Sequence, residues 1–566
     1  MEQNIWQIRD FSKGQIENVK SNILPDNATF DARNFIADSY GGLKKRKGRV
    51  LLGDGFLSGA IQGIYPYYQT AKINNDLIIL AGGDIYIYNK DTGFYAVTLV
   101  ATGVVNSDGT TITYVSGDEF STIWGGFINI DGNNYEIASI TSNTALEITE
   151  NIGVQSGLDY TYQSGHTSIL GHPQYPLFKT ALFGEALFNE PSEAKIIFPL
   201  TTSVNIYLEQ AVNYIVGMNG VDKPWKWDGN FFSYLANAPD KGNYPILHKE
   251  KLFCVDQDEP STLIWSDTFA PESWTPTNYW DIRKSDGDVI TCLIKYLDDL
   301  FVFKNRSLSI LKGTSLDDFT MIESNATIGC VGNRAATIYD MSVFFISEYG
   351  LYVTDGMKMV NLTNNIIPDT WRRLNKIHAH KSTLIAWNDM LWFTIPVDNS
   401  VVPNLTILFD PGNGAFYLME GIRVSCYTKY NDGTGTNLYS GSPISGSVYI
   451  EDTGTDDHGK PINAYWKGKY FDVGIPGLEK KSVKLFVQHA SDVEYNAEIY
   501  VSTDFGEYIP LKYYRDKGSY SEYDFENEYN RWNLISPQIV HDKIGGYELK
   551  EIAIPYKTKT RLGVPE

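Results

Sequence analysis

The sequence predicts an all-β fold: a β-propeller of about seven blades, with six to eight allowed, that carries an inserted small β domain and ends in a C-terminal β domain. Two observations predict it. Aromatic residues make up 14% of the 566 residues, with 38 Tyr, 27 Phe and 12 Trp, and aromatic residues are enriched in strands. In addition, one strand–turn–strand unit recurs seven times, and an internal repeat indicates a repeat architecture.

Each copy of the repeat is a short apolar strand, a turn, and a second strand of aromatic and aliphatic residues. The first strands begin at Asp76, Asn213, Lys251, Leu300, Val343, Met390 and Asn437. From the second copy on, the steps are 38, 49, 43, 47 and 47 residues, close to the roughly 45 residues of a four-stranded blade. Two β-sandwiches with similar hairpins are the alternative, but a sandwich does not require a near-constant step. Residues 166–212 are a candidate for another blade with a weaker pattern.

The spacing of the copies also suggests the domain boundaries. The 136 residues between the starting positions Asp76 and Asn213 of the first two copies exceed a blade, and residues 94–165 contain short strands with polar turns. This indicates a small β domain inserted into a blade hairpin, with a long decorated blade as the alternative. The repeat stops after Gly454. The expected regions are an N-terminal arm (1–59), the propeller (60–93 and 166–462), the inserted domain (94–165) and a C-terminal β-rich domain (463–566). Helix signals are weak, and residues 367–376 are a modest candidate.

The charge and the cysteines narrow the class of protein. There are 68 acidic and 47 basic residues, a net charge of −21, which argues against a protein that grips phosphate backbones through a broad basic surface. No apolar run reaches the roughly 18 residues of a membrane span, and the N-terminal stretch from Met1 to Phe11 lacks the pattern of a secretory signal. The four cysteines lie far apart without a CxxC pair, which predicts buried, reduced thiols. They are Cys254, Cys292, Cys330 and Cys426.

Each candidate for chemistry has a structural alternative that we favour. His378 and His380 are expected on one side of an extended strand, but no third metal ligand has sensible spacing. Residues 502–506 (STDFG) resemble the Asp-box turn of sialidase-type propellers, which has no catalytic duty. Paired acids fall at predicted turns rather than across a glycosidase cleft, and tryptophans that could line a sugar cleft also suit blade cores. The acids are Asp298–Asp299, Asp317–Asp318 and Asp456–Asp457, and the tryptophans are Trp225, Trp227, Trp265, Trp274, Trp280 and Trp392. We expect no catalytic residue, no metal and no cofactor.

The N-terminus differs in charge from the rest of the chain. Residues 1–50 contain nine basic and six acidic residues, a local +3, so the other 516 residues carry −24. The basic segment is a candidate protein interface for an acidic neighbour, and its alternatives are a role in holding the arm in place or an exposed turn that aids solubility. Its residues are Lys44, Lys45, Arg46, Lys47 and Arg49.

Four short motifs within this N-terminal segment occur in an order that is informative about the family. They are residues 11–14 (FSKG), residues 25–26 (PD), Asn34, and residues 42–46 (GLKKR). This order resembles the start of the tail-tube nozzle proteins of short-tailed bacteriophages, also called tail tubular protein B, and of related DNA-stabilisation or tail-hub proteins. Gln15 stands where that family usually has a second Gly, and the chain is shorter than the larger nozzles. The close resemblance is confined to the segment from Met1 to Val50.

The resemblance implies a structural virion protein without catalysis. Such a protein would form a ring of identical subunits, a homo-hexamer, below the portal and adaptor proteins, with tail fibres or other tail proteins as further partners. The ring would enclose the DNA exit channel, retain packaged genomic DNA and take part in its ejection without reading its sequence. The expected location is the virion tail, assembled in the host cytoplasm. The alternatives are a carbohydrate-binding or glycan-cleaving β-propeller, and a tail fibre or baseplate adaptor.

Overall fold

The structure is a computed structural model in which the chain forms two compact units, each treated by itself below. The first comprises Met1–Val50, Ala335–Val424 and Ile450–Glu566, and the second comprises Leu51–Arg334 and Ser425–Tyr449. The residues that the structure describes are 4–20, 23–53, 57, 59–68, 76–89, 93–117, 120, 127–131, 133–142, 144–167, 200–227, 232–314, 318–324, 327–492, 497–517, 519–526 and 530–558. In this part of the chain, no helix is long and apolar enough to cross a membrane.

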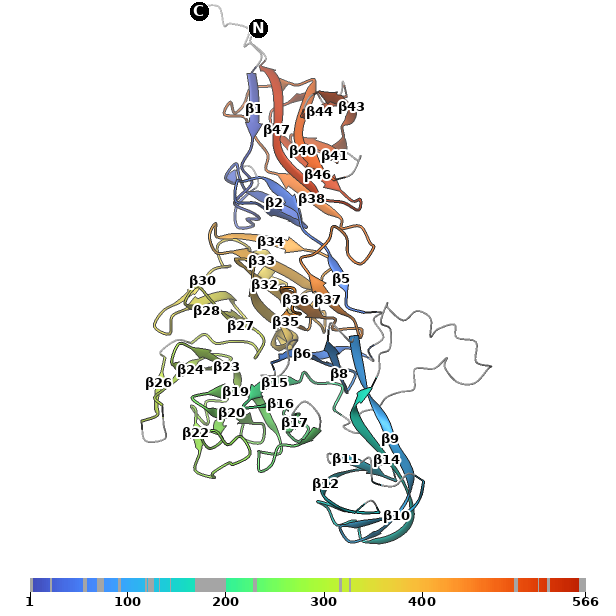
Figure 1. Ribbon diagram of the computed structural model, residues 1–566. Coiled ribbons are helices and arrows are strands. Elements are labelled where there is room, and N and C mark those ends of the chain that lie inside the picture. Colours follow the sequence, from blue (N-terminus) through green and yellow to red (C-terminus); the bar gives the residue numbers. More distant parts are fainter. Residues whose placement is uncertain are drawn as a thin grey trace, which may run out of the picture. The chain divides into compact units, whose positions relative to one another are not determined.

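The fold is all-β and of propeller type (Figure 1), because seven four-stranded antiparallel meanders follow one another along the chain. In the second unit, the first meander is β6 (Ile61–Tyr67), β7 (Asp76–Ala81), β8 (Asp84–Asn89) and the start of β9 (Gly93–Asp108). The next is β15 (Tyr207–Ala211), β16 (Tyr214–Met218), β17 (Trp225–Trp227) and β18 (Phe232–Tyr234). It is followed by β19 (Gly242–His248), β20 (Lys251–Asp256), β21 (Thr262–Trp265) and β22 (Tyr279–Asp281).

Two more meanders complete the series, and the last of them extends beyond the second unit. They are β23 (Ile290–Tyr296), β24 (Asp299–Lys304), β25 (Leu308–Lys312) and β26 (Thr320–Glu323), and then β35 (Cys426–Asn431), β36 (Thr436–Gly441), β37 (Val448–Glu451) and β5 (Arg49–Leu51). The first strands of the five meanders lie beside one another in the order β35, β6, β15, β19, β23. The fourth strand of the last meander, β5, precedes β6 in the chain.

A short segment before residue 335 links these first strands. The Arg334 guanidinium donates to three backbone carbonyls, which belong to Gln62 (2.5 Å), Ile206 (2.8 Å) and Ser425 (3.2 Å). The neighbouring Asn333 side chain accepts the N–H of Leu293 in β23 at 3.0 Å. Because these groups belong to or directly precede β6, β15, β35 and β23, two consecutive residues tie four blades together.

The inserted segment forms a small barrel in the second unit. Its strands are β9, β10 (Thr111–Gly117), β11 (Phe127–Ile130), β12 (Asn133–Ser142), β13 (Ala145–Ile148) and β14 (Val154–Thr167). They pair in the order β10–β13–β12–β11–β14–β9, and β9 pairs back to β10, so these six strands form a closed ring. Figure 1 shows β9 and β14 running side by side into the barrel. Its core includes Val105, Ile112, Phe120 and Tyr160.

The first unit contains the other two meanders and the longest helical elements of the described chain. The meanders are β27 (Ala336–Tyr339), β28 (Ser342–Ser347), β29 (Gly350–Thr354) and β30 (Met359–Asn361), then β31 (Thr383–Trp387), β32 (Met390–Ile395), β33 (Leu405–Asp410) and β34 (Ala415–Met419). Between them lie α1 (Pro368–Arg372) and a 3-10 helix (Lys376–Lys381). The helix expected within residues 367–376 is therefore present as α1.

The C-terminal region is a two-sheet sandwich to which the N-terminal residues contribute strands. One sheet contains β3 (Phe35–Ala37), β4 (Leu43–Lys45), β47 (Tyr547–Thr558), β40 (Lys484–Ser491), β44 (Tyr520–Asp524) and β43 (Lys512–Lys517), with β1 (Asn4–Ile8), β39 (Lys480–Lys481) and β45 (Arg531–Trp532) attached. The other contains β2 (Thr29–Arg33), β38 (Ala464–Gly468), β46 (Ile535–His541), β41 (Glu498–Thr503) and β42 (Ile509–Pro510). Ile8, Phe11 and Phe35 belong to its core. The segment from β1 to β4 thus belongs structurally to the end of the chain.

Comparison with the predicted repeat shows which strands the pattern identified. All seven predicted hairpins are the second and third strands of the seven meanders, for example β7 with β8 and β32 with β33. Trp225, Trp227 and Trp265 are among the largest fully or almost fully buried side chains, which confirms their expected packing role. The further blade considered in residues 166–212 cannot be compared, because residues 168–199 lie outside the described part. The boundaries of the four expected regions stay predictions.

Candidate functional site

The basic segment, the interface candidate from the sequence, lies in the first unit and divides into exposed and buried side chains. Lys44 is 51% exposed and pairs with Asp38 at 3.2 Å. Lys47 is 62% exposed, and its ammonium lies 3.7 Å from Asp452. These two exposed lysines can still meet a partner, and their interface role stays a prediction.

Arg46 lies inside the unit and is surrounded by acceptors. Its side chain is only 2% exposed, and it forms a two-pronged pair with Asp457, at 2.9 Å through Nη1 and 2.6 Å through Nη2. Its Nε donates to Asn34 Oδ1 at 2.9 Å, and the remaining donors reach the carbonyls of Lys47 (3.0 Å) and Glu420 (3.1 Å). Such planar, two-pronged contacts are the strong form of an arginine–carboxylate pair. Arg46 therefore fixes the arm to the rest of its unit.

Lys45 and Arg49 also direct their charges inward. The Lys45 ammonium donates to the carbonyl of Lys543 at 2.6 Å and lies 3.2 Å from His541 Nδ1. Burial, with a contribution from the nearby Arg46, lowers the pKa of Lys45 to about 8. Arg49 donates to the carbonyl of Gly421 at 2.9 Å. Of the roles considered for the segment, the geometry of these side chains matches the one that holds the arm in place.

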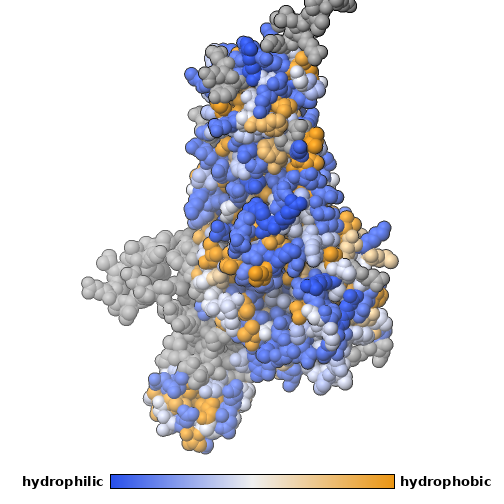
Figure 2. All heavy atoms as spheres, turned by 180° about the vertical axis from the view of Figure 1, so that it is seen from behind, coloured by the Kyte–Doolittle hydropathy of each residue, from blue (hydrophilic) through white to orange (hydrophobic). Residues whose placement is uncertain are grey.

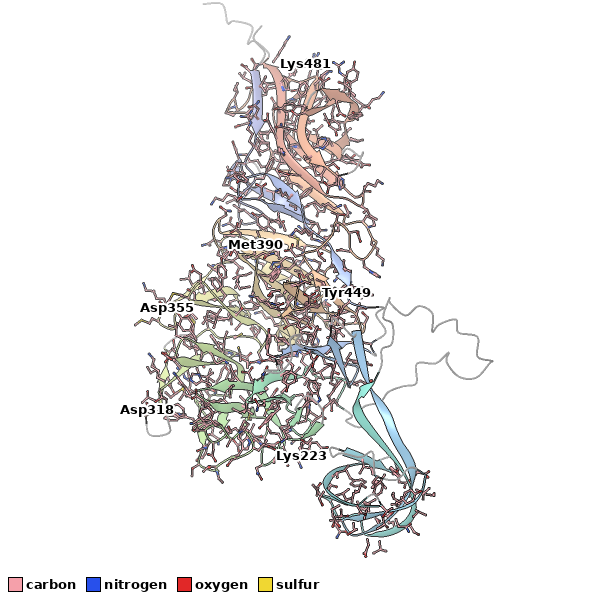
Figure 3. The ribbon with its side chains drawn as sticks, viewed as in Figure 1. Lys223, Asp318, Asp355, Met390, Tyr449 and Lys481 are labelled. Carbon is pink, nitrogen blue, oxygen red and sulfur yellow. The ribbon has the colours of Figure 1, made fainter. Side chains whose placement is uncertain are left out.

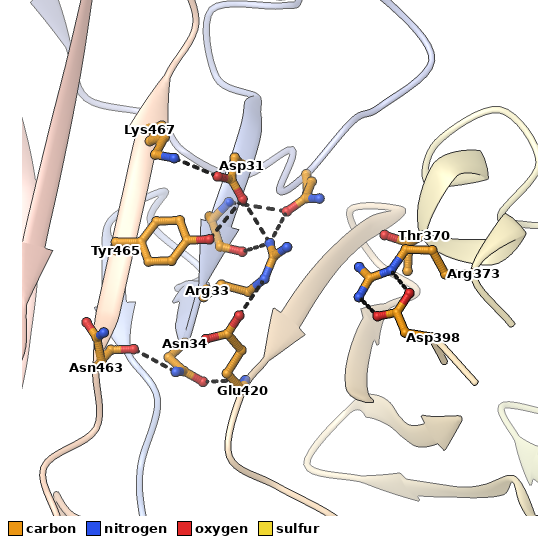
Figure 4. A network of polar contacts seen from close by, with 12 residues as sticks. Asp31, Arg33, Asn34, Thr370, Arg373, Asp398, Glu420, Asn463, Tyr465 and Lys467 are labelled. Carbon is orange, nitrogen blue, oxygen red and sulfur yellow. Dashed lines mark hydrogen bonds and ion pairs between the residues drawn. The ribbon is translucent and has the colours of Figure 1, made fainter. Parts of the chain in front are cut away.

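Asn34 is the centre of the contacts between the arm and the neighbouring strands (Figure 4). Its φ of +61° is a left-handed conformation, which Asn tolerates better than most residues. Its Nδ2 donates to the carbonyl of Asn463 (2.7 Å), and its Oδ1 accepts from Arg46 Nε and from the backbone N–H of Glu420 (2.9 Å). Its own N–H donates to the carbonyl of Leu418 at 3.0 Å. One buried amide thus links the arm to the end of β34 and to the start of β38.

Beside Asn34, a chain of charged groups runs across β2 and β38 (Figure 4). Asp31 accepts from Tyr465 Oη at 3.1 Å and pairs with Lys467 at 2.9 Å. Arg33 lies 3.1 Å from Asp31 and 3.3 Å from Glu420. Glu420 is exposed, but Asp31, Arg33 and Lys467 are only partly exposed and share partners, so the network aligns the two strands more firmly than isolated surface pairs would.

Gly14 and Gln15, at the first motif, pass close to β34. Gly14 has φ +60°, and a Cβ on it would lie 2.6 Å from the carbonyl oxygen of Phe416. Gln15, which departs from the family pattern, is buried, and its N–H donates to that same carbonyl at 3.0 Å. Its Oε1 accepts from Ala32 N at 3.2 Å and from Arg33 at 3.1 Å. In this chain the position has a hydrogen-bonding role that a glycine could not perform.

Glu17 provides the missing cap of helix α1. The N-cap residue, Ile367, makes no side-chain cap. Instead the Glu17 carboxylate accepts from the backbone N–H of Thr370 at 2.8 Å and from its hydroxyl at 2.5 Å. A carboxylate at a helix N-terminus satisfies an otherwise unpaired N–H and interacts favourably with the helix dipole. The arm is therefore bound at both ends of its path, by Glu17 at α1 and by Arg46 at Asp457.

The structure corrects one expectation about candidate metal ligands. His378 and His380 lie in the 3-10 helix, not on an extended strand, and their ring centroids are 6.2 Å apart. Residues 376–381 follow α1 after a short turn, so the helical hydrogen bonds override the alternation that suggested a strand. Among the described residues, no group of three or more His, Cys, Asp or Glu is arranged to hold a metal.

The acids that were singled out in the sequence and that the structure describes make hydrogen bonds or ion pairs within their own unit, some of them with residues far away in the chain. Asp298 pairs with Lys249 at 2.7 Å, Asp457 holds Arg46, and Asp318 accepts from the N–H and the hydroxyl of Thr314. Asp317 lies outside the described residues. Figure 3 marks Asp318 and, on another hairpin, Asp355, whose carboxylate accepts the N–H groups of Met357 and Lys358. The contacts of Asp318 and Asp355 with groups two to four residues away are typical of acids in turns.

The Asp-box-like segment and the cysteines match their structural interpretations. Asp504 has φ +50°, and its carboxylate accepts the N–H groups of Asn533 (3.1 Å) and Leu534 (2.9 Å), so it holds a turn. All four cysteines are buried free thiols. Burial raises the pKa of Cys254 and of Cys426, which keeps both thiols protonated and unreactive.

The surface of the described residues is mixed in polarity on the face shown in Figure 2. In Figure 2, apolar residues occur in small groups among polar ones on the face shown. The sequence missed the partners of the basic segment, Asp457 and His541, because they lie 411 and 496 positions from Arg46 and Lys45. The sequence singled out Asn34 through its place in the motif order, but gave no signal for its binding partners.

Comparisons with known proteins found only structures of low sequence identity. No family model matches it, and no curated protein matches it. PorZ, a surface component of the type-IX secretion system of Porphyromonas gingivalis, is 11% identical with a TM-score of 0.32, covering 76% of this chain and 44% of its own. An ancestral GH74 enzyme is 12% identical with a TM-score of 0.34, covering 69% and 56%. The Neurospora crassa Pan2 WD40 domain is 10% identical with a TM-score of 0.25, covering 75% and 99%. Likenesses this weak carry no argument about function, and the chain spans less than half of the PorZ chain.

Proposed function

We propose that this chain is a structural protein of a bacteriophage tail. In this proposal six identical subunits form a ring below the portal and adaptor. The ring encloses the DNA exit channel. The chain has no catalytic role and no cofactor, retains packaged DNA until ejection, and resides in the virion tail. The observation that carries the proposal is the order of four motifs between Phe11 and Arg46, which resembles the start of tail nozzle proteins.

The contacts of those motif residues support the proposal because they give three of the four motifs a physical reason. Phe11 lies in the sandwich core, Gly14 passes Phe416 where no Cβ fits, Asn34 joins two segments, and Arg46 pairs with Asp457. A motif whose members each have a fixed structural task is less prone to arise by chance than a run of basic residues. The same contacts suit a subunit that has to stay rigid within a ring.

The overall charge supports the same function. Outside residues 1–50 the chain carries −24, and a wall of acidic groups repels phosphates, whereas a basic wall would retain them. DNA that leaves a particle has to slide past the protein without adhering. An acidic surface is therefore compatible with a channel through which DNA passes.

The test is assembly. Native mass spectrometry of the purified chain, alone and with the portal and adaptor proteins of the same genome, is expected to show a closed ring that joins the portal-containing complex, and electron microscopy of that complex is expected to show this chain around the channel. A stable trimer, or a monomer that never joins such a complex, would refute the proposal and favour a fibre or baseplate adaptor. Cleavage or binding of host glycans, lost when carboxylates are removed, would instead favour the carbohydrate-active alternative.

A further inference from the structure

A stack of three rings, two of them buried, lies at one end of the C-terminal sandwich. His541 at the end of β46 stacks on Tyr547 at the start of β47, with centroids 4.9 Å apart and planes 25° apart. On Tyr547 also lies His489 of β40, at 5.3 Å and 27°. His541 is fully buried and belongs to one sheet of the sandwich, whereas Tyr547 and His489 belong to the other. The stack therefore joins the two sheets.

The arm contributes a buried cation to this stack. Lys45, in strand β4, places its ammonium 3.2 Å from His541 Nδ1, so this nitrogen has to accept and His541 has to be neutral while Lys45 is charged. Strand β4 also pairs with β47 through Leu43 and Lys44. The contact thus depends on the protonation of one imidazole, and it lies where the arm joins the sandwich.

Few anionic groups face this site in the described part of the chain. Lys45 is influenced by Arg46, which is unfavourable, and by Asp542 and Asp457. His541 is influenced by Lys45 and His489, which are unfavourable, and by Asp542. On the far side, His489 Nε2 contacts Ser521 Oγ at 2.8 Å, and this hydroxyl donates to Asp516 at 2.7 Å. A proton added to His541 would create two cations in contact, and Asp542 is the carboxylate that influences both.

We infer that Lys45, His541 and the ring stack form an acid-sensitive latch that holds the N-terminal arm to the C-terminal sandwich at neutral pH and releases it on acidification. The inference concerns this chain alone and holds whether or not the chain is a tail protein. Protonation of His541 removes one of the two acceptors of Lys45, leaving only the Lys543 carbonyl, and places like charges 3.2 Å apart, so the arm strand β4 leaves the sandwich first. The adjoining contacts of Arg46 and Glu17 do not depend on this proton.

The direction of the pH effect follows from the burial of His541. Burial, then Lys45, lowers the pKa of His541 to about 4, below the 6.5 of an exposed imidazole. Between these two values the open state binds one more proton than the latched state. Latching is therefore complete above pH 6.5 and weakens as the pH falls, by up to about tenfold in the opening equilibrium per pH unit.

The latch is tested by hydrogen–deuterium exchange of the full chain between pH 7 and pH 4.5. The rates are corrected for the intrinsic pH dependence of amide exchange. Peptides that cover β4 and the start of β47 are expected to open about tenfold or more as the pH falls from 6.5 to 4.5, before peptides of β31 to β34. His541→Gln keeps an acceptor and is expected to flatten this dependence. His458→Asn, at an exposed histidine of the same unit, is the matched control and is expected to leave it unchanged.

Lys45→Met provides a second variant in case His541→Gln does not fold. It retains His541 but removes the neighbouring cation, so protonation costs less and the acid-induced opening is expected to become smaller. If β4 in the unmodified chain opens no earlier than the blade strands, or if both variants keep its full pH dependence, the latch does not exist.

Discussion

Replacing Arg46 by Met tests whether the arm is a structural strap of its unit. The substitution keeps most of the apolar stem but removes five hydrogen bonds, two of them to Asp457, which is itself only 16% exposed. Breaking one side of a buried ion pair costs about 3–5 kcal/mol, because the remaining charge stays buried without compensation. At about 2–4 °C per kcal/mol for a unit of roughly 250 residues, the thermal transition of the first unit should fall by about 6–20 °C.

Lys47→Met is the matched control for this prediction. Lys47 is the next residue, 62% exposed, and its pair with Asp452 is long at 3.7 Å, so its loss should cost about 0–1 kcal/mol. Differential scanning calorimetry of the two variants, of Asp457→Ala and of the Arg46→Met/Asp457→Ala double variant measures the coupling between the partners. A loss for Arg46→Met no larger than for Lys47→Met, or an absence of coupling with Asp457, would refute the strap.

Three further variants, two single and one double, separate effects on folding from effects on assembly. Gly14→Ala places a Cβ 2.6 Å from the Phe416 carbonyl at φ +60° and should lower the stability of the first unit by about 1–3 kcal/mol, measured by thermal unfolding; an unchanged transition would show that the arm can move away from β34. Arg334→Met leaves three backbone carbonyls without their donor and should destabilise the second unit by about 2–4 kcal/mol, seen as faster exchange in β6 and β15, whereas exchange equal to that of the unmodified chain would contradict a clasp. Lys44→Ser with Lys47→Ser should leave both thermal transitions in place but weaken ring formation in native mass spectrometry, and full assembly would end the interface prediction for these lysines.

The blade hairpins were predictable because burial leaves a strong local pattern. The second and third strands of a blade are covered on both faces, as in β28 and β29, and such strands appear as continuous apolar runs. Some fourth strands, such as β22 and β30, are only three residues long and partly exposed, so they carry little pattern.

The role of the N-terminal arm could not be predicted, since its partners lie at the other end of the chain. Strand β1 pairs with β47, the last strand of the described chain, and no local periodicity encodes such a pairing. The basic segment appeared as a charged surface run because a single sequence does not show that Arg46 has Asp457 as a buried partner or that Lys45 meets His541. The sequence showed which residue types form the basic segment, but it did not show that some of their side chains are buried.

The distribution of charge changes what the local +3 at the N-terminus means. Lys45, Arg46 and Arg49 direct their charges to groups inside the first unit, so the N-terminal segment does not present a broad basic surface. The stronger asymmetry is in the inserted barrel region. Residues 94–165 contain no Lys or Arg, and their acids are Asp108, Asp118, Glu119, Asp131, Glu136, Glu147, Glu150 and Asp159. A region with eight acids and no base repels phosphate backbones. If the chain is a tail protein, the insert is thus a part to which passing DNA does not adhere.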